Sequence, residues 1–203
     1  MTTSPFPPLA DLQVISCSVV RHELGFLQAS GDFPYPIEFL NSKLHLTPSN
    51  LGEQLQKKIH GYLRSGKGVL LVYGDCHASM VDMGQSARVA RTESLNCIEL
   101  LISKAQRREW LKKRFFFLLP EWTERWEEIL LHMPGMTPEQ SIDLFRRENR
   151  GLCYLDTGVV PVPTPKLLAC SETLSLAYEI LPVGLTHFRG VLREAVKKLE
   201  TCG

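Results

Sequence analysis

The stretch GVLLVYGDCHASMVDMGQSARVARTESLNC, residues 68–97, carries the pattern that decides the fold. It opens with an apolar, β-favouring run at 69–73, which is bounded by glycines and predicts a buried strand. Gly74 ends this strand, and the triplet Asp-Cys-His follows at 75–77. Asn-Cys at 96–97 then opens an apolar, helix-favouring segment. Since ligands of open α/β sheets bind outside the carboxyl ends of the strands, both cysteines stand where binding groups are expected.

Apolar runs of strand length alternate with amphipathic helical segments along the chain. This alternation predicts an α/β, three-layer Rossmann-like fold with a mostly parallel sheet and helices on both faces. We expect a flexible N-terminal arm at 1–11 and a single α/β domain at 12–203. Trp122 and Trp126 are expected in the core, on one side of a helix at 121–132. The predicted strands are at 12–20, 35–40, 69–73, 88–92, 115–119, 152–155 and 177–182.

Length and charge exclude several classes of protein. The 203 residues are enough to bury one core without staples. A formal net charge of +1 gives no electrostatic reason to expect nucleic acid or an anionic membrane surface as a partner. No apolar run approaches the roughly 18 residues of a membrane span, and the proline-rich start lacks the basic and apolar regions of a signal peptide. The sequence therefore predicts a cytoplasmic protein with no nucleic-acid and no membrane partner.

The chain contains six cysteines. In a cytoplasmic protein thiols are reduced, so metal binding, catalysis or simple burial are the options. The sequence has no Cys-x-x-Cys pair, so a metal site must be assembled from distant segments. Cys17, Cys76 and Cys97 fall at or near predicted strand ends and helix starts. The others lie within a strand, within a helix and in the C-terminal tail, and we interpret them as structural or incidental: Cys153, Cys170 and Cys202.

The first hypothesis is a metal centre. Thiolates and imidazoles are the ligands that suit zinc and iron–sulfur clusters, and a tetrahedral site takes about four of them. Cys17, Cys76 and Cys97 are the predicted ligands, with His45 or His77 in the fourth position or beside it. Helix N-termini near Cys76 and Cys97 are expected to lower the thiol pKa and so favour the bound thiolate.

Two other interpretations stay open. Cys76 is a candidate nucleophile of a metal-free enzyme, with His77 or His45 as its base and Asp75 or Glu99 orienting that base. Alternatively, the same edge forms a binding module for a small anionic or corrinoid-like ligand, which would use helix N-termini. Neither a dinucleotide-binding fingerprint nor a P-loop occurs in the sequence, so no nucleotide cofactor is expected.

Six segments carry a resemblance to known sequences: ISCSVVRHEL at 15–24, LHLTP at 44–48, LVYGDCH at 71–77, NCIELL at 96–101, FFFLLPEW at 115–122 and YLDTGVVPVP at 154–163. With these segments the chain resembles the uncharacterised prokaryotic family DUF1638, a domain of unknown function, roughly from Val14 to Leu199. The sequence departs from the family pattern at Asp75 and His77, where many members are rich in glycine, and at Asn96.

The resemblance implies that the three thiols form one unit that holds a metal or a cluster. Because three thiolates with one open position suit a 4Fe–4S cluster, we expect an iron–sulfur cluster ahead of zinc. Glu23 and Glu99 are then catalytic candidates, which would handle protons or support the ligands. The family context implies an accessory role beside corrinoid-dependent methyl transfer in one-carbon metabolism. The implied partners are corrinoid or methyltransferase proteins and a small-molecule ligand. The residues expected to contact the cofactor are His45, Asp75, His77 and Asn96.

Overall fold

The computed structural model describes residues 11–76, 80–83 and 88–200. His77 and Cys202 lie outside the described residues, as does the arm predicted at 1–11 except for Asp11. Among the helices of the described part, none combines the length and the apolar character that crossing a membrane requires.

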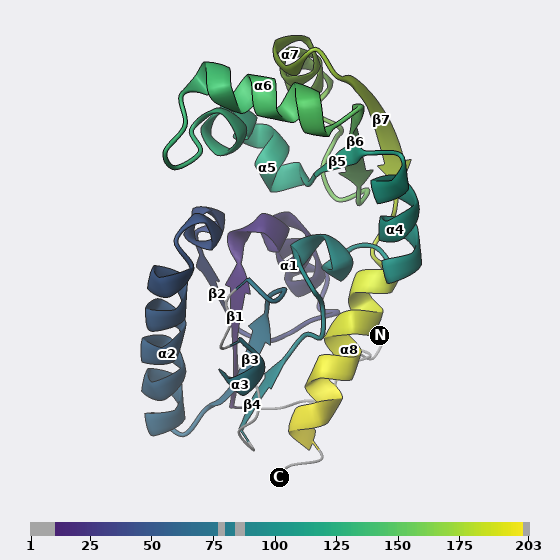
Figure 1. Ribbon diagram of the computed structural model, residues 1–203. Helices are drawn as coiled ribbons and strands as arrows, with labels where there is room; N and C mark the ends of the chain where they lie inside the picture. The colour runs from purple at the N-terminus through teal and green to yellow at the C-terminus, as the bar shows by residue number, and fades with distance from the viewer. Residues whose placement is uncertain (1–10, 77–79, 84–87, 201–203) are drawn as a thin grey trace.

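Four parallel strands form the first sheet, in the order β2–β1–β3–β4 (Figure 1). Every residue of the inner strand β1 is buried, as expected for a parallel strand covered on both faces. The register pairs Ser16 with Val72, so Cys17 and Tyr73 stand at the same edge of the sheet. The bounds are β1 (Leu12–Cys17), β2 (Ile37–Leu40), β3 (Gly68–Val72) and β4 (Val89–Arg91).

Three further parallel strands form a second sheet, in the order β5–β6–β7. They are β5 (Phe115–Leu118), β6 (Gly151–Asp156) and β7 (Ala177–Pro182). The predicted α/β class, with parallel strands and covering helices, is confirmed. The strands divide between two sheets, which hydrophobic periodicity does not reveal because it does not say which strands pair.

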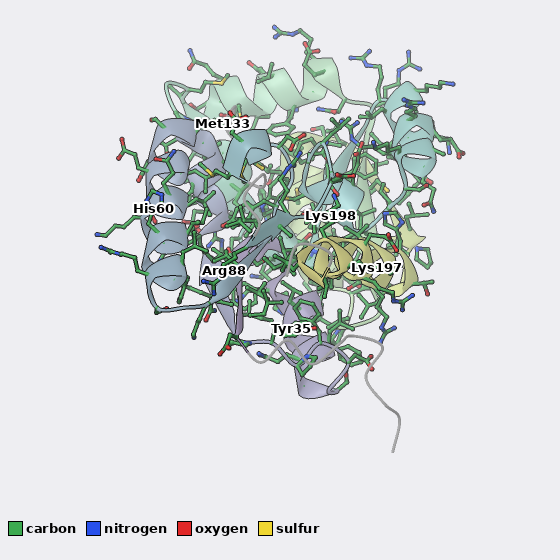
Figure 2. All side chains as sticks on the ribbon, turned by 90° about the horizontal axis from the view of Figure 1, so that it is seen from below. Tyr35, His60, Arg88, Met133, Lys197 and Lys198 are labelled. Carbon is green, nitrogen blue, oxygen red and sulfur yellow. The ribbon has the colours of Figure 1, made fainter. Side chains whose placement is uncertain are left out.

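Helices cover both sheets. α2 and α8 lie on opposite sides of the first sheet and both contact it (Figure 1). Their polar faces point outwards, so His60 of α2 and Lys197 of α8 are exposed on opposite sides of the molecule (Figure 2). α5 and α7 contact the second sheet. The bounds are α1 (Arg21–Ala29), α2 (Pro48–Arg64), α3 (Met80–Met83), α4 (Lys104–Lys112), α5 (Pro120–Glu124), α6 (Pro138–Glu148), α7 (Thr164–Leu174) and α8 (Thr186–Glu200).

Short turns interrupt three of the predicted elements. The strand predicted at 12–20 ends at Cys17 and continues as a 3₁₀ turn, η1 (Ser18–Val20). The helix predicted from Cys97 is only a 3₁₀ turn, η3 (Cys97–Leu100), before Ser103 caps α4. The helix predicted at 121–132 breaks after α5 into a π turn, η4 (Glu127–Leu131). A further 3₁₀ turn, η2 (Ser42–Leu46), follows β2.

Candidate functional site

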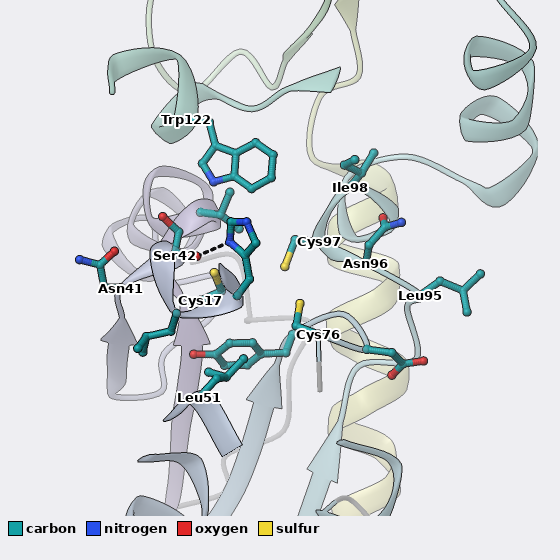
Figure 3. A pocket seen from close by; sticks show the side chains of 15 residues that line it. Cys17, Asn41, Ser42, Leu51, Cys76, Leu95, Asn96, Cys97, Ile98 and Trp122 are labelled. Atoms are coloured by element: carbon teal, nitrogen blue, oxygen red, sulfur yellow. Dashed lines mark hydrogen bonds between the residues drawn. The ribbon is translucent and has the colours of Figure 1, made fainter. Parts of the chain in front are cut away.

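A cavity of about 230 Å³ lies at the carboxyl edge of the first sheet, where β1 and β3 end (Figure 3). Its lining is mainly apolar. Trp122 of α5 faces it from the side of the second sheet. The structure brings most of the predicted site residues to this cavity: Cys17, His45, Asp75, Cys76, Asn96 and Cys97.

Gly74 explains how two of the cysteine segments approach each other. Cys76 follows β3, and Cys97 is the first residue of η3. A Cβ atom added at Gly74 would lie 2.2 Å from the Cα of Asn96 and 2.7 Å from the backbone nitrogen of Cys97. Only a glycine therefore lets the two segments pack backbone against backbone at this point.

The three thiols lie next to one another in the cavity, with Cys97 in contact with both Cys76 and Cys17. The contact with Cys97 and then burial raise the pKa of the Cys76 thiol. For Cys97, the contact with Cys17 and burial raise the pKa more than the contact with Cys76 lowers it. The expectation that helix N-termini lower these pKa values is therefore wrong for the protein without a bound cation, because the elements are short turns and the thiols crowd one another.

His45 lies in η2 with its ring orientation fixed. Its Nδ1 is 2.5 Å from the carbonyl oxygen of Ser42. A carbonyl only accepts, so Nδ1 carries the proton and donates, and the lone pair of a neutral ring is then on Nε2. The imidazole also packs against the Trp122 indole, with ring centroids 5.5 Å apart. A histidine with Nδ1 held by a carbonyl is the arrangement that metal-ligating histidines commonly have.

Asp75 and Asn96 line the cavity but have structural partners of their own. The carboxylate of Asp75 is ion-paired with Arg91. The side chain of Asn96 caps η3 by accepting a hydrogen bond from the backbone nitrogen of Glu99 at 3.2 Å. Both side chains therefore stabilise the loops that present the cysteines.

The two predicted glutamates lie outside the cavity lining. Glu99 Oε2 accepts from the backbone nitrogen of Leu95 at 3.1 Å, so this carboxylate supports the loop that carries Cys97. Glu23 is fully buried in α1, where Thr157 donates to its Oε1 at 2.9 Å. Its Oε2 has no hydrogen-bond partner among the described residues, and burial raises the pKa of its carboxyl group.

Among the lining residues that were not predicted as site residues are Tyr73 and Trp122. Tyr73 is 3% exposed, and burial followed by the nearby thiols of Cys17 and Cys97 raises its pKa, so the hydroxyl stays protonated. Trp122, predicted as helix core, packs against both hydrophobic cores and also lines the cavity. Helical spacing identified the apolar side of its helix but not the cavity that this side faces.

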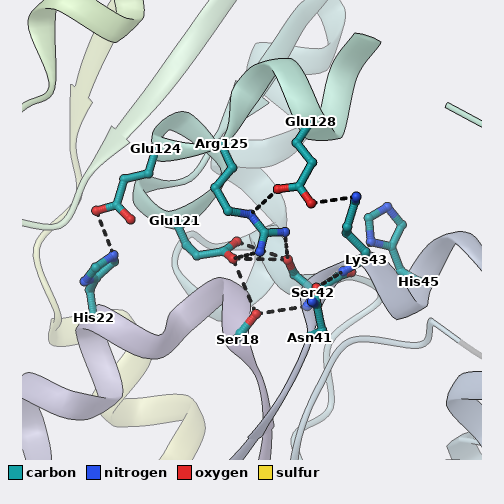
Figure 4. Close-up of polar contacts among 10 residues, drawn as sticks. All are labelled: Ser18, His22, Asn41, Ser42, Lys43, His45, Glu121, Glu124, Arg125 and Glu128. Atoms are coloured by element: carbon teal, nitrogen blue, oxygen red, sulfur yellow. Dashed lines mark hydrogen bonds and ion pairs between the residues drawn. The ribbon is translucent and has the colours of Figure 1, made fainter. Parts of the chain in front are cut away.

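Glu121 is a buried carboxylate beside the cavity (Figure 4). It lies in the quoted segment FFFLLPEW but was not singled out as a site residue. It accepts hydrogen bonds from Ser18 Oγ at 3.4 Å and from Ser42 Oγ at 3.1 and 3.3 Å. Arg125 Nη1 lies 3.4 Å from Glu121 Oε1. Ser18 follows Cys17, Ser42 holds His45, and Glu121 precedes Trp122, so one carboxylate fixes three parts of the cavity wall.

The predicted metal ligands are not arranged as a preassembled metal site would require. Among the described residues, no three or more His, Cys, Asp or Glu side chains are placed so that they could hold a metal ion. The described cysteines interpreted as structural are buried elsewhere, Cys153 in β6 and Cys170 in α7. Burial raises the pKa of each of these two thiols to about 12.

Comparison with known proteins covers five of the six segments quoted above; the first, at 15–24 with Cys17, lies outside the matched residues. Curated proteins and solved structures give no match to this chain. A family model described as "Protein of unknown function (DUF1638)" matches residues 39–192, which include His45, Cys76, Cys97 and Trp122. Because that match covers more than half of the sequence, the chain belongs to the DUF1638 family of proteins of unknown function.

Proposed function

We propose that this chain is an accessory protein that holds a thiolate-ligated metal centre, an iron–sulfur cluster in preference to zinc, at the edge of its first sheet. Cys17, Cys76 and Cys97 are the proposed ligands, and His45 is the candidate for the fourth position. The observation that carries the proposal is the proximity of the three thiols, which three separate segments bring to one cavity.

The chemistry of the donors fits such a centre. Thiolates and a neutral imidazole are the preferred ligands of zinc, and thiolates those of iron–sulfur clusters. Crowding and burial oppose the ionisation of Cys76 and Cys97, and a bound cation compensates for both effects. Because the side chains do not yet stand in a metal-holding geometry, the proposal requires the cysteines to rotate about χ1 when the metal enters.

The same observations disfavour a metal-free enzyme with Cys76 as nucleophile. A reactive cysteine needs a lowered pKa, whereas the pKa of Cys76 is raised. The group in contact with its thiol is a second thiol with a raised pKa, Cys97, which is not a base that could deprotonate it.

The proposed biological role is an accessory step beside corrinoid-dependent methyl transfer, and it rests on the family resemblance. The cavity is smaller than the roughly 300–1,000 Å³ of pockets for drug-sized ligands. A corrin ring carried by a partner protein would therefore meet the centre at the mouth of the cavity. Titration of the purified protein with cobalamin, followed by visible absorbance, tests for this contact, and unchanged spectra would count against it.

Anaerobic purification and iron–sulfur reconstitution, followed by metal and sulfide analysis and visible absorbance, test the metal centre. We expect a stoichiometric chromophore that Cys17→Ala, Cys76→Ala and Cys97→Ala each abolish. Cys153→Ala and Cys170→Ala are matched controls, because they remove buried thiols outside the cavity lining and should keep the metal. A colourless parent protein that binds neither iron nor zinc in stoichiometric amount would refute the proposal.

A further inference from the structure

Two of the cysteines that line the cavity are placed to form a disulfide in the protein without a metal. The thiols of Cys76 and Cys97 are in contact, and their sulfur atoms point towards each other (Figure 3). Gly74 packs backbone against backbone on the segment that carries Cys97, which keeps the two segments together. Thiols that already touch need only small rotations about χ1 to reach the geometry of a disulfide.

The exposure of the thiols indicates which pair forms. Cys17 and Cys97 are 7% and 9% exposed, whereas Cys76 is half-buried. A reagent that enters the cavity therefore meets the Cys76 thiol first. Cys97 is the thiol in contact with Cys76, so it is the group that completes a disulfide with it. Cys17 is left as a free thiol on the other side of Cys97.

The lining also indicates the class of oxidant. Among the described residues that line the cavity, none is a lysine or an arginine, so an anionic oxidant finds no positive partner in that lining. The carboxylate there, Asp75, is already paired with Arg91. Apolar side chains such as Val19, Leu44 and Leu51 form much of the wall. A small organic disulfide without charge is therefore the oxidant that suits this cavity.

We propose that Cys76 and Cys97 are a reversible redox pair, which a small uncharged disulfide oxidises in the metal-free protein. The Cys76 sulfur loses its proton to solvent and attacks one sulfur of the reagent, whose S–S bond breaks and releases a thiolate that takes up a proton. The Cys97 sulfur, after losing its own proton, attacks Cys76 in this mixed disulfide and expels a second small thiol. Two protein thiols are thus oxidised, and one disulfide is reduced to two thiols.

The oxidised pair would control the loading of the metal centre, because the disulfide removes two of the three proposed cysteine ligands. This consequence rests on the proposed function. The disulfide itself does not, since both thiols are present in the metal-free protein. The pKa of the Cys76 thiol is raised, so we expect slow exchange at neutral pH. The extent of oxidation at equilibrium, and not its rate, is therefore the quantity to measure.

Equilibration of the reduced, metal-free protein with 2-hydroxyethyl disulfide and 2-mercaptoethanol, followed by alkylation, tryptic digestion and mass spectrometry, tests the pair. We expect peptide 68–88 linked to peptide 92–104, and this link should form at a ratio of disulfide to thiol at least about tenfold lower in the native protein than in urea. Cys76→Ser and Cys97→Ser should each abolish the link. Cys17→Ser removes the remaining thiol of the cavity and should keep it, as should Cys170→Ser outside the lining.

Three results of this experiment would overturn the inference. The first is a link between peptides 1–21 and 92–104 in the parent, which would make Cys17 the partner of Cys97. The second is oxidation that stops at the mixed disulfide on Cys76. The third is a link that forms equally readily in the native and the unfolded protein, since the fold would then contribute nothing.

Cobalt(II) separates failure of the redox pair from failure of the metal centre. We expect cobalt–thiolate absorbance with the reduced protein, none with the oxidised protein, and its return after reduction with a phosphine and desalting. Equal absorbance of the oxidised and reduced proteins would overturn the control of metal loading. If the reduced protein binds neither cobalt nor an iron–sulfur cluster, the proposed function fails, and the peptide map still decides whether the disulfide forms.

Discussion

Ser42 Oγ donates a hydrogen bond to Glu121 Oε2 at 3.1 Å, and this bond joins a turn beside the first sheet to a helix that packs on the second. Both groups are buried. The Ser42 carbonyl also holds His45, and Glu121 directly precedes Trp122, so this contact fixes two walls of the cavity relative to each other. The two sheets therefore meet through polar contacts as well as apolar packing.

Removing the Glu121 carboxylate should destabilise the protein strongly. Glu121→Ala leaves two serine hydroxyls and Arg125 without their buried partner, and we expect a loss of about 3 kcal/mol in the free energy of unfolding. Urea denaturation measures this loss. The control is Glu128→Ala, whose half-exposed carboxylate pairs with Lys43 and Arg125 and should cost less than about 1 kcal/mol. Equal effects of the two substitutions would contradict the role given to Glu121.

Gly74→Ala should separate the two cysteine segments. The new methyl group would stand 2.2 Å from the Cα of Asn96, which is backbone and must shift. We expect a loss of about 1–3 kcal/mol and faster alkylation of Cys97 as its segment moves. Gly61→Ala in α2 is the control, since its methyl group would meet no described atom within 4 Å, and it should stabilise the helix by about 0.5–1 kcal/mol. Unchanged stability and unchanged labelling of Gly74→Ala would show that the close approach is not required.

Stability should depend on pH through Glu23. Burial raises the folded-state pKa of this carboxyl group above its ordinary value of 4.5, so the folded protein binds the proton more tightly than the unfolded chain does. This contribution is favourable below pH 4.5 and is lost as the pH rises from 4.5 through the folded-state pKa. Glu23→Gln stays uncharged and keeps an acceptor for Thr157, so the variant should gain stability relative to the parent as the pH rises through this window. Denaturation of both proteins at a series of pH values measures the difference, and parallel curves would contradict the prediction.

Metal binding should release protons from Cys76 and Cys97. Their pKa values are raised, so both thiols are protonated at neutral pH and must lose a proton to become ligands. Calorimetric titration with zinc in buffers of different ionisation enthalpy should detect at least two protons for each zinc bound, and the apparent affinity should rise with pH. Cys170→Ala should release the same number. Zinc binding without proton release would show that these thiols are not ligands.

The sequence could predict that the three cysteines meet at one edge of the sheet, and the reason is physical. The carboxyl ends of neighbouring parallel strands share one edge of a sheet, and β1 and β3, which precede Cys17 and Cys76, pair directly. Cys97 joins them because its loop packs on Gly74. The periodicity of each segment thus predicted the edge at which its polar residues lie.

The residues that the α5 segment, beside the second sheet, brings to the cavity could not be predicted from periodicity. An apolar face on the α5 segment predicts burial of Trp122 but does not identify what buries it. Glu121 was not predicted as a site residue, because its buried partners Ser18 and Ser42 are remote in sequence. Glu23 was predicted near the site from its motif, yet its position in α1 turns it towards Thr157 instead.

The position of α8 in the sequence determines when the core of the first sheet can be completed during synthesis. β1 to β4 end at Arg91, whereas α8, which buries Phe188, Leu192 and Val196 in the same core, begins at Thr186. A ribosome therefore releases the thiol-bearing strands long before the segment that shields one of their faces, and domains complete their packing only when such segments are available. Until α8 has been synthesised, the four strands of the first sheet lack the helix that covers one of their faces, so the proposed metal centre would form only after that point.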